Sequence, residues 1–281
     1  MEVLALQGMD LEIKKGEFTA IIGNSGSGKS TFLNMIGGLD TPSAGKLFVD
    51  EKNLFTMKGS ELEQYKKNTV GFVWQNNARN MFPYMTAVEN IQLPMQFVNK
   101  KTKKSWEFSG SDKEKALELL ELVGMSHRKN SVLNQLSGGE RQRIAIAIAL
   151  ANQPKVLLAD EPTGAVDAKT SNYIFDVFRK LNEEREVTIV IVTHDVELAK
   201  KVNRVVRICD GKISQEQIRK QSYAEQLAHA ESFVEEHSHE EYAVLDKAGR
   251  IQLSKEFLEK IGVEGKRVKV EVMDDKIIIS K

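Results

Sequence analysis

The chain has 281 residues, which is enough for one large domain and a small one. Hydrophobic residues make up 41% of it and charged residues 28%, proportions that are ordinary for a soluble globular protein. Because 40 Lys and Arg balance 40 Asp and Glu, the bulk charge favours neither a nucleic-acid-binding protein nor a membrane-surface protein. The single cysteine, Cys209, excludes an internal disulfide framework and fits a reducing cytosol.

Neither a targeting segment nor a membrane span is recognisable in the sequence. The first residues, MEVLALQGMDLEIKKGE, include acidic side chains and lack a long apolar core, so they do not read as a signal peptide. The longest apolar runs, such as IAIAIALA, are too short to cross a bilayer. If the protein acts at a membrane, we therefore expect another chain to supply the spans.

Four short apolar runs, FTAII, VGFVW, VLLA and TIVIV, predict the strands of a parallel sheet. Continuous Val- and Ile-rich runs are typical of strands buried on both faces. Helix-like stretches separate them, which implies crossover connections and an α/β core. Ligands bind beyond the carboxyl ends of strands in such sheets, so the residues after the runs are expected to converge, although strands also end in polar turns without any function. These residues are Gly23, Gln75, Asp160 with Glu161, and Thr193 with His194.

A glycine-rich loop follows the first run and predicts a phosphate site. Residues 23–30, GNSGSGKS, fit the pattern G-x-x-x-x-G-K-[ST], in which backbone N–H groups at a helix N-terminus bind phosphate oxygens. Lys29 is expected to reach the β- and γ-phosphates, and the Ser30 hydroxyl to ligate Mg²⁺. The predicted phosphate-binding residues are Gly23, Asn24, Ser25, Gly26, Ser27, Gly28, Lys29, Ser30 and Thr31.

The ends of the other three runs supply candidates for metal binding and catalysis. Asp160 is placed to hold Mg²⁺, and the adjacent Glu161 to polarise an attacking water as a general base. Two adjacent acids after a hydrophobic strand would be costly without a cation, which argues against a purely structural role. His194 is placed to hydrogen-bond the γ-phosphate and the water, although a lone histidine is usually structural. Gln75 is a neutral amide that can contact both the metal and the water.

A second glycine-rich segment, LSGGERQR, also precedes a predicted helix. Taken alone, Ser137 and Glu140 form a capping box, and a purely structural cap is as good a reading as an anion site. The set of motifs changes this balance. The phosphate loop, Gln75, LSGGE, LLADEPTGAVD and His194, in this order, resemble the ATP-binding-cassette (ABC) ATPases over residues 1 to about 212.

This resemblance implies an α/β P-loop core with a helical subdomain, which binds ATP and Mg²⁺ and hydrolyses ATP. It further implies a head-to-tail homodimer. In that dimer, Ser137, Gly138 and Gly139 of one molecule bind the γ-phosphate held by the loop of the other, and Asp167 couples the two sites. Ile148 stands where the family usually has arginine, and Val166 where it usually has leucine. Members usually begin earlier, with an aromatic residue that stacks on adenine, so we expect weak discrimination between ATP and GTP.

Segments such as GFVWQ and TAVENIQLPM most resemble the LolD-, MacB- and FtsE-like branch, which serves lipoprotein release and macrolide or peptide export. That branch implies a peripheral position on the cytoplasmic face of a bacterial membrane and a separate FtsX- or MacB-like permease. The stretch NARNMFPYMTAVENI would contact a coupling helix of the permease, although core packing is an equally good reading. A soluble, non-transport ABC ATPase is the less favoured alternative, because such proteins commonly carry two cassettes.

Two polar segments carry weaker signals. The basic insertion at 99–113 reads as a solvated loop, with lipid headgroups or nucleic acid as the less favoured ligands. Residues 213–240 read as a polar, helical linker. Its three histidines, His229, His237 and His239, match no specific metal spacing.

The last residues, 241–281, predict a separate small domain. Strands are expected around 242–246, 250–253, 268–273 and 276–280, a helix at 255–261 and a hairpin turn at 274–275. This order resembles the AbrB/SpoVT swapped-hairpin domain. Such domains often bind DNA, but nine Lys and Arg against eight Asp and Glu give a net charge of only +1 here. About forty residues cannot easily bury a core alone, so dimerisation is favoured over a DNA-binding regulator.

Overall fold

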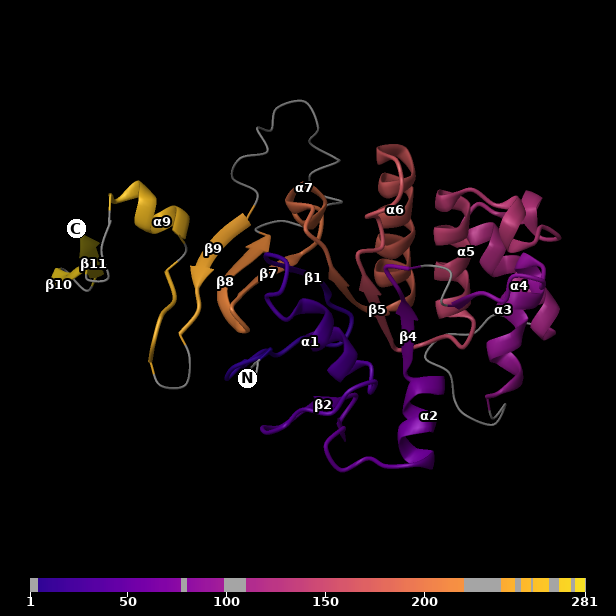
Figure 1. The fold of residues 1–281 in the computed structure, drawn as a ribbon, viewed down its shortest axis with the longest axis horizontal. Helices are drawn as coiled ribbons and strands as arrows, with labels where there is room; N and C mark the ends of the chain where they lie inside the picture. The colour runs from indigo at the N-terminus through magenta and orange to yellow at the C-terminus, as the bar shows by residue number, and fades with distance from the viewer. Residues whose placement is uncertain are drawn as a thin grey trace.

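The computed structural model describes residues 5–76, 80–98, 110–219, 239–245, 249–253, 255–262, 268–273 and 276–280. Its centre is a seven-stranded sheet with the strand order β4-β5-β6-β1-β7-β8-β9 (Figure 1). In that order the strands are β4 (Val70–Val73), β5 (Val156–Asp160), β6 (Thr188–Val192), β1 (Phe18–Ile22), β7 (Arg204–Cys209), β8 (Lys212–Arg219) and β9 (His239–Ala243).

The first five strands of this order are parallel. The four apolar runs predict β4, β5, β6 and β1, whereas β7 was not predicted. Strand β1 pairs with β6 and β7, and β5 pairs with β4 and β6, all in the parallel sense. Every residue of β1, β5 and β6 is buried, which is why their sequences lack the alternation of a half-exposed strand. The carboxyl ends of these strands therefore share one edge of the sheet.

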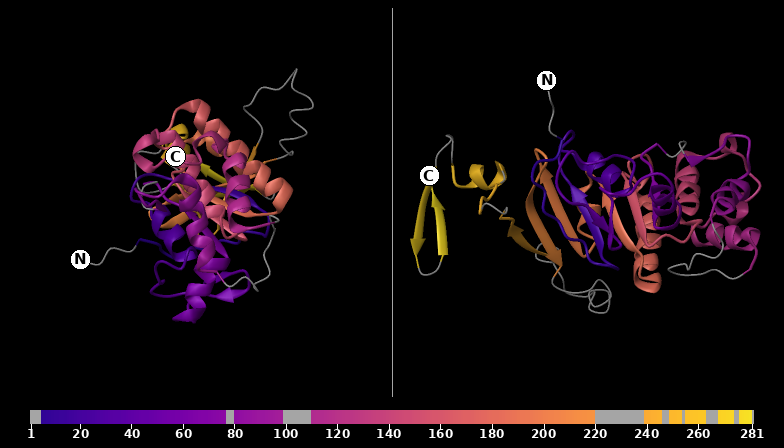
Figure 2. Two further views of the ribbon diagram at one scale, coloured as in Figure 1. Left: turned by 90° about the vertical axis from the view of Figure 1, so that its right-hand side faces the viewer. Right: turned by 90° about the horizontal axis from the view of Figure 1, so that it is seen from below.

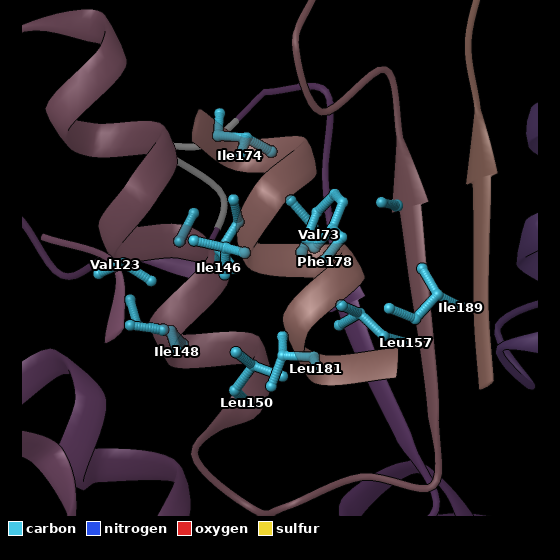
Figure 3. Packing of buried hydrophobic residues seen from close by; sticks show 14 of the residues in the cluster. Val73, Val123, Ile146, Ile148, Leu150, Leu157, Ile174, Phe178, Leu181 and Ile189 are labelled. Carbon is cyan, nitrogen blue, oxygen red and sulfur yellow. The ribbon is translucent and has the colours of Figure 1, made fainter. Parts of the chain in front are cut away.

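Helices cover both faces of the sheet. Alternate residues of a central strand enter different core clusters, so Leu157 packs with Ile146 of α5 (Gly138–Leu150) and Phe178 of α6 (Ala168–Arg185) (Figure 3). The next residue, Leu158, packs in the other cluster with Leu33 of α1 (Lys29–Ile36). The result is the three-layer arrangement expected of a parallel sheet.

A helical region projects from one end of the molecule, beyond the strand β4 edge (Figures 1 and 2). Capping boxes start three of its helices, at Thr86, Ser111 and Ser137. The helices are α3 (Ala87–Gln96), α4 (Asp112–Leu122) and α5, with 3₁₀ turns η2 (Ser126–Arg128) and η3 (Leu133–Gln135). The remaining elements of the core are α2 (Ser60–Asn68), α7 (Val196–Ala199) and the small hairpin of β2 (Phe48–Val49) with β3 (Lys52–Asn53).

The sequence predicts a polar helical linker after residue 212. That prediction is wrong for residues 213–219, because they form strand β8 (Lys212–Arg219). Asp210 and Gly211 both have positive φ, 49° and 74°, and make the two-residue turn that folds β8 back onto β7. Asp-Gly is a strong hairpin signal, and it outweighs the polar composition of the strand. The rest of the predicted linker, up to residue 238, lies outside the described residues.

Strand β9 then adds to the same sheet. It pairs antiparallel with β8, with Gln215 opposite Ala243 and Arg219 opposite His239. The strand predicted at 242–246 therefore begins three residues earlier and belongs to the seven-stranded sheet. The predicted domain boundaries at 212 and 241 fall inside the antiparallel part of the sheet formed by β7, β8 and β9. They therefore do not mark the limits of a separate sheet.

The C-terminal segment contains the predicted helix and final hairpin. Helix α9 (Lys255–Lys260) agrees with the expected 255–261, and β10 (Lys269–Met273) pairs antiparallel with β11 (Lys276–Ser280). The predicted strand at 250–253 is reduced to a single bridge between Leu245 and Ile251. The turn at 274–275 and most of the insertion at 99–113 fall outside the described residues.

Candidate nucleotide-binding site

The predicted phosphate loop connects β1 to α1 and depends on its glycines. Gly26 and Gly28 have φ of 79° and 99°, backbone conformations that other residues rarely adopt. A Cβ on Gly23 would collide with the carbonyl oxygen of Ile208, and one on Gly28 with that of Ala5. The loop is therefore pressed between β7 and the N-terminal segment, and glycine is the residue that fits.

Lys29 places its charge at the mouth of this loop. Its Nζ donates hydrogen bonds to the carbonyl oxygens of Gly23, at 2.7 Å, and Asn24, at 2.8 Å. The ammonium group is thus held over the loop at the N-terminus of α1, where the helix dipole and free N–H groups favour an anion. Ser30 follows in the first turn of α1 with its side chain exposed, and Thr31 is half-buried beside it.

Glu161 and His194 meet at the carboxyl edge of the sheet. The Nδ1 atom of His194 lies 3.0 Å from Oε2 of Glu161, and the backbone N–H of His194 donates to the same oxygen at 3.4 Å. Glu161 has a φ of 47°, and its own N–H donates to the carbonyl of Val192. This left-handed backbone turns a carboxylate only 11% exposed toward the imidazole.

Asp160 and Gln75 leave neighbouring strands at the same edge. Asp160 is the last residue of β5, is buried, and lies opposite Val192 of β6. Gln75 comes two residues after Val73, which pairs with Ala159, so it leaves the sheet beside Asp160 and Glu161 with its side chain exposed. The predicted convergence of the strand ends therefore agrees with the strand register.

The segment at Ser137 begins α5 with the predicted capping box. Ser137 Oγ accepts from the N–H of Glu140 at 3.3 Å, and Glu140 Oε2 accepts from the N–H of Ser137 at 2.8 Å. Arg128 Nε lies 2.8 Å from the other oxygen of Glu140. The backbone N–H of Ser137 is the largest cause that lowers the pKa of Glu140, together with the Arg128 guanidinium, from 4.5 to about 2, against the opposing effect of burial.

The two glycines after Ser137 lie close to the start of α6, where the predicted coupling residue Asp167 is the N-cap. A Cβ on Gly139 would approach Thr170 at 3.3 Å, and one on Gly138 would lie 3.7 Å from the carbonyl of Ala165. Asp167 caps α6 by accepting from the N–H of Thr170 at 2.9 Å, and this hydrogen bond lowers the pKa of Asp167. Ser137, Gly138 and Asp167 are exposed, so they form one surface that a second molecule can reach.

The sequence did not predict that the β7–β8 turn contacts the phosphate loop. The N–H of Gly211 donates to the carbonyl of Ser27 at 3.1 Å, and the N–H of Gln7 donates to the carbonyl of Gly211 at 2.8 Å. The N-terminal segment and the β7–β8 turn therefore brace the loop from one side. The Asp-Gly dipeptide at 210–211 is the sequence signal from which this turn follows.

Comparisons with known proteins agree with this geometry. A family model described as "ABC transporter" matches residues 6–164. An uncharacterised ABC transporter ATP-binding protein of Methanocaldococcus jannaschii is 44% identical over 217 residues, which are 76% of this chain and 89% of that protein. A lipoprotein-releasing system ATP-binding protein, LolD, of Chlorobium chlorochromatii is 40% identical over 206 residues, which are 73% of this chain and 80% of that protein.

A solved structure extends the comparison to three dimensions. It is the dimeric structure of an ATP-binding cassette in a post-hydrolysis state, bound to ADP and Pi. This chain superposes on it with a TM-score of 0.69 and 41% identity, over 77% of this chain and 91% of that one. The chain belongs to the ABC transporter family. Within that family it is an ATP-binding, ATP-hydrolysing subunit, and its relatives include proteins of the predicted LolD-like branch.

Across the described part of the chain, no helix has both the length and the apolar character needed to cross a membrane. Nor do the described His, Cys, Asp and Glu residues form a group of three or more that suits a metal ion. The second result is compatible with Mg²⁺, which is usually held by phosphates and only one or two carboxylates.

The lowered pKa of Glu140 predicts a pH-dependent loss of stability. Because the folded pKa of about 2 lies below the ordinary 4.5, the contribution of Glu140 is fully present above pH 4.5 and is lost as the pH falls toward 2. We expect Glu140→Gln to lower the free energy of unfolding by about 1–2 kcal/mol near neutral pH, and by much less at about pH 3. Urea unfolding at both pH values measures this, with Glu121→Gln on the exposed side of α4 as the control. Equal losses at both pH values would contradict the assignment.

Proposed function

We propose that this chain hydrolyses ATP in composite sites formed by two identical copies and thereby drives a separate membrane permease. The observation that carries the proposal is the pairing of Glu161 with His194, 3.0 Å apart, at the sheet edge where the phosphate loop also begins. The exposed surface of Ser137, Gly138 and Asp167 supports the second half of the site. A second molecule can contact this surface, because the capping hydrogen bonds of Ser137 and Asp167 are formed within the same chain.

In each site, one molecule supplies the phosphate loop. Backbone N–H groups and Lys29 neutralise the phosphates, and the glycine backbone permits their close approach. Ser30, Gln75 and Asp160 offer a hydroxyl, an amide and a carboxylate oxygen, the hard ligands that suit Mg²⁺. When bound, Mg²⁺ neutralises charge that develops on the β- and γ-phosphate oxygens.

Glu161 and His194 orient the attacking water in this proposal. Glu161 accepts a proton from the water as it attacks the γ-phosphorus, and the strained backbone at φ 47° fixes the direction of its carboxylate. The imidazole of His194 holds that carboxylate through Nδ1, 3.0 Å away, so the two side chains act as a pair beside the γ-phosphate. Gln75, exposed at the end of the neighbouring strand, contacts the water or the metal as a neutral amide.

Binding across the dimer makes ATP a regulator of association. The γ-phosphate is contacted by the loop of one copy and by Ser137, Gly138 and Gly139 of the other. The closed dimer is thus favoured only while the triphosphate is intact, and hydrolysis removes the shared contact. Asp167 lies against the same surface and couples the two sites. The solved dimeric cassette with ADP and Pi supports this arrangement by homology.

The loop before α3 is the proposed contact with the permease. Asn90 fixes it, since its Oδ1 accepts from the N–H of Phe82 at 2.7 Å and its Nδ2 donates to the carbonyl of Met85 at 3.0 Å. Phe82 and Tyr84 are 46% and 79% exposed on this clamped loop. Met81 is buried in the core, so core packing accounts for part of this stretch. Exposed aromatics on a rigid loop suit an amphipathic helix of an FtsX- or MacB-like permease, on the cytoplasmic face of a bacterial membrane.

The C-terminal hairpin is proposed to hold two copies together. Val270 pairs with Ile279, and strand alternation places Ile277 on the same face of the hairpin. Val270 and Ile277 are 58% and 71% exposed, although a two-stranded hairpin is marginally stable without a covered apolar face. A second copy of this AbrB/SpoVT-like segment would cover that face and keep two ATPase subunits near each other. The nearly neutral charge of the segment disfavours DNA as its partner.

Glu161→Gln tests the catalytic assignment. The amide keeps the shape of the side chain but cannot accept the proton, so we expect turnover to fall by at least about a hundredfold while ATP remains bound. Gel filtration with ATP and Mg²⁺ should then show a trapped dimer. Glu197→Gln, an exposed substitution on the nearby α7, is the control and should leave both properties unchanged. A Glu161→Gln protein that shows no ATP-induced increase in association would contradict the composite site.

Mixing two inactive variants tests whether the site is shared. Lys29→Ala removes the phosphate-binding charge and Gly138→Glu blocks the contributed pocket, so neither variant alone should hydrolyse ATP. In a mixed dimer one site carries both lesions and the other carries neither. At equal concentrations about a quarter of the wild-type activity should return, because half of the dimers are mixed. A mixture of Lys29→Ala with the double variant should stay inactive. Wild-type activity of the Gly138→Glu protein on its own would show that each molecule works alone.

Ile277→Lys tests the role of the C-terminal hairpin. A charge on the proposed buried face should weaken self-association without nucleotide by at least about tenfold, since burying an unpaired ammonium group is costly. Analytical ultracentrifugation measures this, and Ile218→Lys on the exposed part of β8 is the matched control. Nucleotide affinity should be unchanged in both variants. An unaltered monomer–dimer equilibrium in Ile277→Lys would remove the hairpin from the interface.

A further inference from the structure

A cavity of about 410 Å³ lies between three segments that are distant in sequence. Its walls come from the N-terminal segment, the β7–β8 turn and two short C-terminal stretches. The lining residues are Gln7, Gly8, Asp10, Asp210, Lys212, Ile213, 244–245 and 250–252. The volume suits a small planar ligand such as a nucleobase with its ribose. None of the residues assigned above to phosphate binding or catalysis lines it, so the cavity is a separate feature of the fold.

The cavity shares its walls with the phosphate loop. Gln7 and Asp210 line it, and Gly211 between them donates a hydrogen bond to Ser27 of the loop at 3.1 Å. Gln7 in turn donates to the carbonyl of Gly211 at 2.8 Å. On the other side, Ala5 lies so close to Gly28 that no Cβ fits between them. A ligand whose phosphates fill the loop therefore has the cavity next to it.

The C-terminal wall is held in place by the ATPase sheet. Strand β9 pairs with β8 up to Ala243, opposite Gln215, and the N–H of Val244 donates to the carbonyl of Ser214 at 3.5 Å. The chain then returns, and Leu245 forms a bridge with Ile251. This pairing connects Val244 and Leu245, and through the bridge Ile251, to the strand that leads back to the loop.

The chemistry of this wall fits a purine. Leu245 and Ile251 present exposed apolar side chains, and Arg250 adds a planar guanidinium that can stack on an aromatic ring. Gln252 also lines the cavity, and among the described residues its Oε1 is buried without a hydrogen-bond partner. A buried acceptor without a donor costs free energy, so rotation of the carboxamide toward a donor on a ligand is favourable.

We propose that this cavity binds the base of the ATP whose phosphates the loop holds, with Gln252 as the residue that selects adenine. A carboxamide can accept from the 6-amino group of adenine and donate to its N7. Guanine presents a carbonyl oxygen at position 6, which leaves the acceptor of Gln252 unpaired. Arg250 stacks on either base. The inference rests on the proposed nucleotide site, and it replaces the expectation of weak discrimination between ATP and GTP.

Displacement of a fluorescent methylanthraniloyl-ADP from the full-length chain by ATP and by GTP tests the proposal. The wild-type protein should bind ATP at least about tenfold more tightly than GTP, since a site that pairs a polar group rejects analogues lacking it. Gln252→Met keeps the size of the side chain without its amide. It should bring the two affinities to within about threefold of each other. Gln64→Ala, an exposed amide on α2, is the control and should keep the wild-type preference.

Two further measurements separate the possible failures. Inosine triphosphate carries the 6-carbonyl but lacks the amino group of guanine, so the wild-type protein should bind it as weakly as GTP, and this needs no variant. Lys29→Ala should lose all three nucleotides. Absence of any nucleotide binding to the wild-type protein would refute the proposed function. Tight, equal binding of ATP, GTP and inosine triphosphate, or an unchanged preference in a folded Gln252→Met protein, would overturn the assignment of the cavity alone.

Discussion

The parallel pairing of β4, β5, β6, β1 and β7 is the constraint on which the rest of the structure depends. Parallel strands end at a common edge, and this is what brings Glu161 within 3.0 Å of His194 although 33 residues separate them in the chain. The same pairing sets Gln75 beside Asp160 through the register of β4 against β5. The geometry of the candidate site follows from backbone hydrogen bonding, because its side chains come from the points where the strands leave the sheet.

Much of this arrangement could be predicted because its signals are local. The four apolar runs, the phosphate loop and the capping box at Ser137 each lie within a few residues, and all agree with the structure. Strand β8 could not be assigned from its composition, because KISQEQIR is polar and only its pairing with β7 makes it a strand. The addition of β9 to the ATPase sheet depends on pairing across the segment 220–238, and nothing in the local sequence specifies such a partner.

The segment at Ser137 shows that structural and functional readings need not compete. Its hydrogen bonds satisfy the N-terminus of α5, and Glu140 carries a lowered pKa because it accepts the N–H of Ser137. Gly138 and Asp167 nevertheless remain exposed, and a Cβ on Gly138 would lie 3.7 Å from the carbonyl of Ala165, just before α6. A cap that stabilises one molecule can thus present a preformed surface to another without loss of its own stability.

Strand β9 gives the C-terminal segment a direct mechanical link to the ATPase. Five residues of β9 pair with β8, which turns through Asp210 and Gly211 into β7, and Gly211 is hydrogen-bonded to Ser27 of the phosphate loop. The β7–β8 hairpin alone therefore connects strand β9 to the predicted phosphate loop. A load applied to β9 is carried by backbone hydrogen bonds toward Ser27 of the predicted phosphate loop.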